Sequence, residues 1–418
     1  TAFTIMSNEI PYARIGISYY RIIQRPLISG DTASVLIKWS KETILQDHNR
    51  TYLDRIPKYV GFCCIPSHTD HRQVIGNFYN TYNPIGHVPV SGNFNLDQLA
   101  EKCSRSLRFM KHIFGGHYEF GLDYLKVLYL FPSQILPIIC LVSKERATGK
   151  STFLKWLKEI FGLNMTYIKG DSFASQFNSD WASMLIVAMD EVFFDKKEIT
   201  ERLKYLSTTN KDKLEQKGKD REEIDFFAKF ILCSNNEDDF IQIDEKEIRF
   251  WILKVCPIKE EDTEFLSGLI AEIPYFLRYL VNRPFFRNKS TRMWFKAEDI
   301  RTTALKRLVW KNNNKLEGRL IEILYEFFQQ TDEREFNATP QDLLQLHNKF
   351  FKPGNCSLSD IRQTLKENWK IEPRGNSLTY ARYGVDYSGG FYQETKVGRF
   401  FTISRDFILS KFDELMRK

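Results

Sequence analysis

The chain has 418 residues, more than one hydrophobic core usually organises, so we expect two or three globular domains. With 43% hydrophobic residues it is not an intrinsically disordered protein, and its longest apolar run, residues 135–142, is too short to span a bilayer. A formal net charge of +7 is modest for this length, so the surface as a whole is not built to bind polyanions. The seven scattered cysteines fit a reducing compartment, and no secretory signal is visible, so we expect a cytoplasmic protein.

Residues 1–95 predict an N-terminal accessory domain of short strands and turns. The segment 34–39 is a strand candidate, and the glycines and prolines that follow it mark turns. Within this domain, one segment of nine residues contains four potential soft metal ligands. These ligands are Cys63, Cys64, His68 and His71. Because two adjacent thiolates rarely bind one ion, a zinc site is the less favoured interpretation of this cluster.

Residues 96–290 predict a helical collar followed by an α/β core. Apolar residues recur at helical spacing from Leu99 to Ile113 and again from Leu122 to Leu130. Apolar runs of strand length come next, each separated from the next by helical or polar sequence. These runs are residues 135–142, 184–189 and 230–233. Such alternation predicts a mostly parallel sheet with helices on both of its faces.

The first of these strands leads into a turn that suits phosphate binding. An apolar strand, a glycine turn and the amphipathic helix 153–161 together present backbone N–H groups and a helix N-terminus to a polyphosphate. We expect Lys150 to reach the β and γ oxygens of ATP and the Ser151 hydroxyl to ligate Mg²⁺. Lys144 stands where the usual pattern has its first glycine. The residues expected to bind ATP are Thr148, Gly149, Lys150, Ser151 and Thr152.

The second strand ends in two carboxylates, Asp190 and Glu191. Asp190 at the carboxyl end of a strand is suited to hold Mg²⁺, and Glu191 to orient and polarise the attacking water. An acidic helix cap after a core strand is the alternative interpretation. Because the pair follows a phosphate-binding strand in the chain, we favour the catalytic one.

Two further residues are candidates for contacts with the γ-phosphate. Asn235 directly follows the third strand, where an amide can hydrogen-bond the γ-phosphate or the lytic water; an ordinary turn is the alternative. Arg249 precedes another strand-like run, and its guanidinium is suited to stabilise the transition state at a neighbouring subunit's γ-phosphate. A local ion pair of Arg249 with Asp244 or Glu247 is the alternative.

A basic segment lies between the second and third strands. From Lys196 to Arg221 it holds nine Lys and Arg residues against five Asp and Glu residues. Lys217 and Lys219 flank Gly218 at the expected tip of a hairpin, where they are placed to grip a phosphate backbone without reading sequence. We therefore predict that both lysines bind DNA. A solvated helix and loop face is the alternative.

Residues 291–418 predict a C-terminal domain of helices followed by strands. The expected helices are 316–328, 340–351 and 357–369, and the β-prone segments are 377–383 and 398–404. The Gly389–Gly390 turn separates the two β-prone segments. Three helices and a two-stranded hairpin outline a winged helix, a frequent DNA-binding module, although plain packing gives the same pattern.

Taken together, these motifs resemble superfamily 3 helicases, particularly the helicase part of phage and plasmid primase-helicases. The resemblance covers about residues 105–285. It depends on the order of Gly149 to Thr152, Asp190 and Glu191, the hairpin at Lys217 to Lys219, Asn235 and Arg249. It implies a P-loop NTPase core of the AAA+ type that assembles into a homo-hexameric ring with ATP between subunits. It also implies that Arg249 acts in trans, that the hairpin lysines line a DNA channel, and that members move 3′ to 5′.

We therefore expect an ATP-dependent replicative DNA helicase of a phage or mobile genetic element, which uses ATP and Mg²⁺ and moves on single-stranded DNA in the host cytoplasm. Because the chain begins with Thr1 and not Met, a further upstream domain stays open as an alternative. A primase or polymerase partner, if there is one, lies either on such an N-terminal segment or on another chain. One alternative is an ATP-gated DNA-binding initiator or helicase loader without processive unwinding. An RNA-directed motor is another, since stacking and backbone contacts barely distinguish the two sugars.

Overall fold

We describe the chain from a computed structural model, which divides it into two compact units. The first unit comprises Thr1–Phe194, Glu198–Phe240 and Ile248–Leu305, and the second Asp195–Lys197, Ile241–Glu247 and Lys306–Lys418. The structure describes residues 10–26, 32–194, 196–218, 220–243, 247–258, 262–351, 356–386 and 389–416. No helix within these ranges is long and apolar enough to cross a membrane.

The core of the first unit is a parallel sheet with the strand order β14-β8-β13-β10-β9. Its strands are β8 (Ile138–Val142), β9 (Met165–Tyr167), β10 (Ile186–Met189), β13 (Lys229–Ser234) and β14 (Phe250–Lys254). Every neighbouring pair in this sheet is parallel. All residues of β8, β10 and β13 are buried, as expected for strands covered on both faces. The predicted parallel sheet is therefore confirmed.

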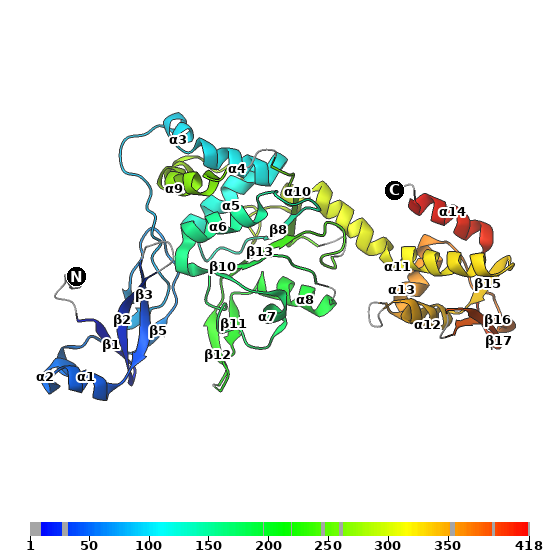
Figure 1. Cartoon of the computed structure of the whole chain (residues 1–418), viewed down its shortest axis with the longest axis horizontal. Coiled ribbons are helices and arrows are strands. Elements are labelled where there is room, and N and C mark those ends of the chain that lie inside the picture. Colours follow the sequence, from blue (N-terminus) through cyan, green and yellow to red (C-terminus); the bar gives the residue numbers. More distant parts are fainter. Residues whose placement is uncertain are drawn as a thin grey trace. The chain divides into compact units, whose positions relative to one another are not determined.

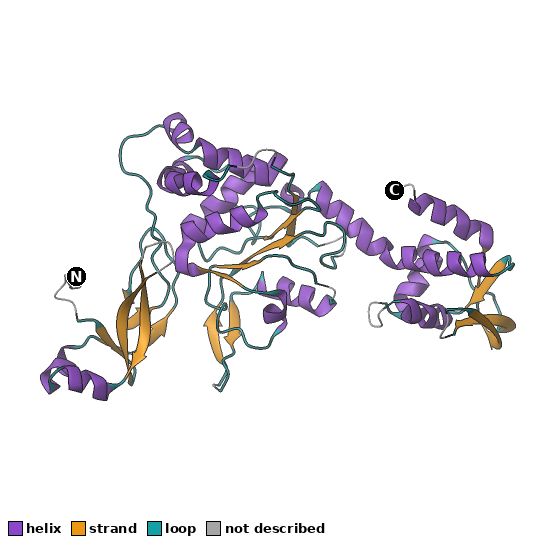
Figure 2. Ribbon diagram, viewed as in Figure 1, coloured by secondary structure: helices purple, strands orange, loops and turns teal. Residues whose placement is uncertain are grey.

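Helices cover this sheet (Figure 2). Between helices and sheet lies a core rich in aromatic side chains. The helices include α3 (Leu96–Lys102), α4 (Ser104–Phe114), α5 (Tyr118–Leu130), α6 (Lys150–Phe161) and α9 (Phe265–Asn282). Helix α6 buries Phe153, Trp156 and Ile160 on one face and exposes Lys155 on the other. The Trp156 and Phe276 rings lie 4.9 Å apart and join α6 to α9. Because α6 directly follows β8 and its loop, this packing fixes its N-terminus at the carboxyl edge of the sheet.

The N-terminal part of the first unit contains two small sheets and two short helices. One sheet has the order β3-β2-β1-β4 and the other β5-β7-β6. The strands are β1 (Tyr12–Ile15), β2 (Ser18–Pro26), β3 (Thr32–Trp39), β4 (Lys58–Tyr59), β5 (Gly61–Cys63), β6 (Val74–Ile75) and β7 (Phe78–Asn80). Helices α1 (Lys41–Asp47) and α2 (Arg50–Arg55) were not predicted, because helices this short show no clear 3.6-residue periodicity. Each begins at a capping side chain, Ser40 and Asn49.

The two histidines of the cysteine and histidine cluster both contact protein groups through their ring nitrogens. The two ring nitrogens of His68 lie 2.7 Å from the Tyr129 carbonyl oxygen and 2.6 Å from the Tyr82 hydroxyl. Burial lowers the pKa of His68 to about 4, so the ring is neutral at physiological pH. In the part of the chain that the structure describes, no group of three His, Cys, Asp or Glu residues could hold a metal ion.

A hairpin extends from the first unit away from the parallel sheet (Figure 1). Its strands β11 (Lys211–Leu214) and β12 (Glu222–Asp225) pair antiparallel, and Gly218 in the turn has a φ of 76°, which favours glycine. The hairpin that the sequence predicted is therefore present. The remaining helices of this unit include α7 (Gly170–Ala174), α8 (Lys197–Leu206), α10 (Ala297–Ile300) and the 3₁₀ turns Gly115–His117 and Gly162–Asn164.

The second unit packs helices against short antiparallel strands. Its elements are α11 (Thr303–Gln330), β15 (Glu335–Ala338), α12 (Pro340–Phe350), α13 (Leu358–Gln363), the π-helical turn Thr364–Asn368, β16 (Leu378–Val385), β17 (Phe391–Gly398), β18 (Phe401–Ser404) and α14 (Arg405–Met416). The predicted pairing of 377–383 with 398–404 was wrong. Strand β16 pairs with β17, whereas β18 pairs with β15. The sequence of β17 hid this strand, because most of its side chains are exposed and it lacks apolar alternation.

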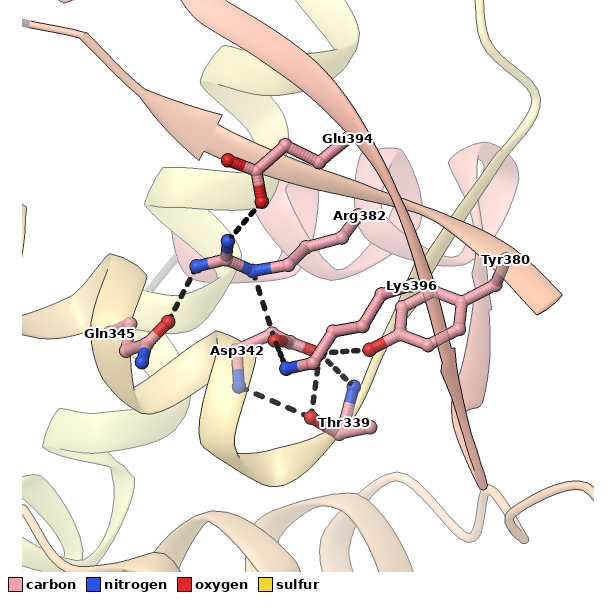
Figure 3. Close-up of polar contacts among 7 residues, drawn as sticks. All are labelled: Thr339, Asp342, Gln345, Tyr380, Arg382, Glu394 and Lys396. Carbon is pink, nitrogen blue, oxygen red and sulfur yellow. Dashed lines mark hydrogen bonds and ion pairs between the residues drawn. The ribbon is translucent and has the colours of Figure 1, made fainter. Parts of the chain in front are cut away.

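A buried carboxylate joins α12 to the β16–β17 hairpin (Figure 3). Asp342 is 1% exposed and accepts hydrogen bonds from Thr339, from the Tyr380 hydroxyl at 2.5 Å and from Lys396 Nζ at 2.7 Å. Arg382 Nε adds an ion pair at 3.1 Å. Since these donors come from the start of α12 and from both hairpin strands, Asp342 holds the three elements together.

Candidate nucleotide site

The loop between β8 and α6 has a backbone that requires glycine at its end. Gly149, the residue before α6, has a φ of 85°, and a Cβ there would lie 3.1 Å from both Phe109 and Ile258 side-chain atoms. The loop is held from outside by His112, whose Nε2 lies 3.0 Å from the Thr148 carbonyl oxygen. Ala147 adopts a positive φ of 53°, a strained conformation for a residue with a side chain. The close packing therefore fixes one loop conformation.

The N-terminus of α6 opens at the end of this loop. The first N–H groups of an α-helix have no intrahelical acceptor, and Gly149 offers them no side-chain cap. They are therefore available to an anion at this end of the helix. Lys150 is buried, with Nζ 3.2 Å from the Thr148 hydroxyl, and Thr152 is half-buried. Burial lowers the pKa of Lys150, while nearby groups, among them the carboxylates of Asp190 and Glu237, oppose that shift.

The structure brings the predicted metal ligands together. Ser151 Oγ donates a hydrogen bond to Asp190 Oδ2 at 2.8 Å, although the two residues are 39 positions apart in the chain. Both side chains are exposed. Hydroxyl and carboxylate oxygens are the hard ligands that Mg²⁺ prefers, so the pair fits a Mg²⁺ ion.

Glu191 lies beside this pair, at the end of β10. Its backbone N–H donates to Asp190 Oδ1 at 3.0 Å, and its side chain is exposed. Its φ of 56° is left-handed, which costs a residue with a side chain about 1–3 kcal/mol. Strain of this kind is often found at functional sites, so the conformation of Glu191 is consistent with a functional role.

Asn235 follows the strand that lies between β8 and β10. Strand β13 pairs with β8 on one side and with β10 on the other, and Asn235 directly follows its last residue. The Ser234 hydroxyl donates to the Val192 carbonyl oxygen at 2.7 Å and fastens the end of β13 to the segment after Glu191. The exposed Asn235 therefore shares one sheet edge with Lys150 and Asp190.

Arg249 lies at the other edge of the sheet. Its carbonyl oxygen accepts a hydrogen bond from the N–H of Ile138, the first residue of β8. The five residues of β14 separate it from the carboxyl edge, a distance of about 16 Å at about 3.3 Å per residue. Arg249 therefore does not join Lys150 in the site of its own chain. Asp244, named as a local ion-pair partner, lies outside the described residues.

Sequence reasoning missed a buried carboxylate at this edge. Glu237 is 4% exposed, accepts a hydrogen bond from the Lys144 N–H at 3.0 Å and pairs with Lys254 at 3.1 Å. Lys144 Nζ also lies 3.1 Å from Asp238. Lys144 stands where the usual phosphate-binding pattern has its first glycine. Through these two contacts it joins the loop between β8 and α6 to the loop after Asn235. The acidic run after β13 was the available signal, but its partner stands 93 residues earlier.

The hairpin carries less free positive charge than its sequence suggested. Lys211 of β11 lies 2.8 Å from Asp225 and 3.8 Å from Glu223 of β12, so the stem neutralises itself. Lys217 in the turn is exposed. Lys219, the second predicted DNA contact, lies outside the described residues. Among the described residues, Lys217 is therefore the predicted DNA contact that the structure leaves exposed in the turn.

Comparisons with known proteins bear on this same region. The model of a family of unknown function, DUF5906, matches residues 141–249, which run from β8 to the start of β14. This stretch contains all the predicted catalytic residues. No curated protein matches the chain.

Solved structures match almost the whole chain. An apo structure of the NrS-1 C-terminal region (305–718) has 16% sequence identity and a TM-score of 0.54, and the match covers 93% of this chain and 96% of that chain. The A form of the same region has 16% identity and a TM-score of 0.50, with 95% of each chain covered. A structure of JCV helicase with a bound small molecule matches 54% of this chain and 62% of that chain at 14% identity, with a TM-score of 0.30. The chain therefore shares the fold of the NrS-1 C-terminal region.

Proposed function

We propose that this chain is an ATP-dependent replicative DNA helicase of a phage or mobile genetic element. The observation that carries the proposal is the contact of Ser151 with Asp190 at the N-terminus of α6, beside the buried Lys150. A helix N-terminus, a lysine and a pair of Mg²⁺ ligands are the parts that a bound nucleoside triphosphate requires. The order of these motifs, which resembles superfamily 3 helicases, and the parallel sheet that brings them to one edge support the same assignment. The proposal takes this sheet and its helices as a P-loop core of the AAA+ type.

Each residue of the site has a separate task in this proposal. Lys150 binds the β and γ oxygens of ATP, and Ser151 and Asp190 hold Mg²⁺, which neutralises charge on the phosphates. Glu191 orients the attacking water and takes up its proton. Asn235 hydrogen-bonds the γ-phosphate. Because Asn235 directly follows β13, loss of that phosphate on hydrolysis changes a contact at the end of the strand.

The assembly in this proposal is a homo-hexameric ring in the host cytoplasm, with single-stranded DNA in its centre. Arg249 completes the site of the neighbouring subunit, which suits its place at the edge of the sheet opposite Lys150. Lys217 and Lys219 contact the DNA backbone. The second unit serves as a winged helix that contacts DNA or a partner such as a primase or polymerase.

The test is ATP hydrolysis and strand separation with single-stranded DNA as the stimulus. Lys150→Ala and Glu191→Gln abolish both activities in this proposal, because one removes phosphate binding and the other removes activation of water. Lys155→Ala is the matched control, since this lysine is on the same helix, α6, but lies on its exposed face. Slow hydrolysis with a preference for duplex DNA and no unwinding would instead identify an ATP-gated initiator or loader.

A further inference from the structure

We propose that Asn178 is a positioning residue that fastens the β11–β12 hairpin to the nucleotide-binding core. The inference rests on the proposed function, and it adds the means by which contact of the hairpin with DNA reaches the ATP site. Asn178 stands outside every motif of the sequence, between α7 and β10, and its side chain is 2% exposed.

The amide of Asn178 binds the backbone of the hairpin as a neighbouring strand would. Its Oδ1 accepts a hydrogen bond from the Glu215 N–H at 2.8 Å, and its Nδ2 donates to the Lys213 carbonyl oxygen at 2.8 Å. The Asn178 N–H adds a bond to the Glu215 carbonyl oxygen at 3.3 Å. These bonds hold β11 where the stem ends and the tip begins. Because the Asn178 side chain is itself buried, losing one of these bonds leaves a buried polar atom unpaired.

Asn178 is itself held firmly by the core. Its carbonyl oxygen accepts hydrogen bonds from the N–H groups of Trp181, at 3.0 Å, and Ala182, at 2.8 Å. The Trp181 ring is fully buried and packs against Phe230 of β13 at 6.3 Å between ring centroids. The hairpin is therefore fastened, at the point where its stem meets its tip, to the residues that pack against β13, the strand that Asn235 directly follows.

Both hairpin strands are connected along the chain to residues of the proposed ATP site. Strand β12 ends at Asp225, and β13 begins at Lys229 and leads to Asn235. On the other side, the chain runs from Glu191 through α8 into β11. With β11 held by Asn178, a displacement of the tip passes along β12 into β13. Without Asn178, bending of the stem absorbs the displacement before it reaches the site.

The test compares Asn178→Ala with Asn164→Ala in the full chain. Asn164 is also buried, at 3% exposure, and also bridges a distant backbone, since it accepts from the Asn83 N–H at 3.0 Å and donates to the Asn83 carbonyl oxygen at 2.7 Å. The measured quantity is the ratio of ATP hydrolysis with single-stranded DNA to hydrolysis without it. We expect Asn178→Ala to lower this ratio about tenfold, since the variant loses both side-chain hydrogen bonds to β11 and the residue after it. Asn164→Ala keeps the wild-type ratio even where its melting temperature falls equally.

An unchanged ratio in Asn178→Ala, or an equal loss in both variants, overturns the proposal and leaves the ATPase assignment intact. Asn178→Asp provides a second variant of the same shape. It retains the acceptor for Glu215 but loses the donor to Lys213, and its ratio is expected to fall as well. Should both Asn178 variants fail to fold while Asn164→Ala folds, Asn178 has only a general structural role. Absence of hydrolysis in the wild-type chain removes the proposed function itself.

Discussion

Asp190 and Asp342 are two carboxylates that the fold treats in opposite ways. Asp190 is exposed at the edge of the parallel sheet, where it accepts hydrogen bonds from Ser151 and the Glu191 N–H. Asp342 is buried in the second unit, where Thr339, Tyr380 and Lys396 all donate to it. A carboxylate that serves a ligand must keep lone pairs accessible, whereas one that serves the fold is saturated by the protein. By this criterion Asp342 is a structural group, whereas Asp190 has the accessibility that the proposed Mg²⁺ binding requires.

The largest expected effect is a loss of stability when the structural carboxylate, Asp342, is removed. Asp342→Ala leaves the cations of Lys396 and Arg382 without their buried partner, so we expect the second unit to lose about 3–5 kcal/mol of unfolding free energy. Calorimetry of the full chain measures the loss. ATP binding by the first unit is expected to be unchanged.

Asp360→Ala is the matched control for that loss. Asp360 accepts hydrogen bonds from Ser357 at the start of α13 much as Asp342 does from Thr339 at the start of α12, but it is exposed. Its removal is expected to cost about 1 kcal/mol, the usual size of a capping interaction. Equal losses in the two variants would show that burial of Asp342 adds nothing.

The next largest effect is a loss of ATP hydrolysis when the exposed carboxylate, Asp190, loses its charge. Asp190→Asn retains the shape of the side chain but removes its charge, so we expect ATP hydrolysis to fall about a hundredfold, equal to about 2.7 kcal/mol. Its melting temperature is expected to stay at the wild-type value, since an exposed side chain contributes little to stability. A variant that loses stability and keeps its activity would reverse the roles assigned to the two carboxylates.

The smallest effect is a dependence on pH. Burial opposes ionisation of Asp342, but hydrogen bonds from Lys396, Thr339 and Tyr380 outweigh it and lower its pKa from 3.8 to about 2. A lowered pKa stabilises the folded state above pH 3.8, and this stability disappears as the pH falls through about 2. The contribution is about 2 kcal/mol at 1.36 kcal/mol per pKa unit. Acid titration followed by circular dichroism measures it, and Asp342→Asn should lack this part of the transition.

Local patterns in the sequence predicted the strands that form the carboxyl edge of the parallel sheet. Apolar runs that end in polar residues identified β8, β10 and β13, and parallel strands bring such ends to one edge. The contact of Ser151 with Asp190 follows from that rule alone. Glu237 and Asn178 escaped prediction because their partners are backbone groups far away in the chain, which no periodicity or motif marks. Strand β17 escaped prediction because its apolar side chains do not alternate with polar ones.

The place of Arg249 has a consequence for how activity varies with protein concentration. An arginine about 16 Å along the sheet from the phosphate loop cannot serve the nucleotide bound by its own chain. If Arg249 contributes to hydrolysis, the rate per chain rises with concentration and vanishes on dilution. Such a chain would not consume ATP while it is alone, and turnover would begin only once copies have met.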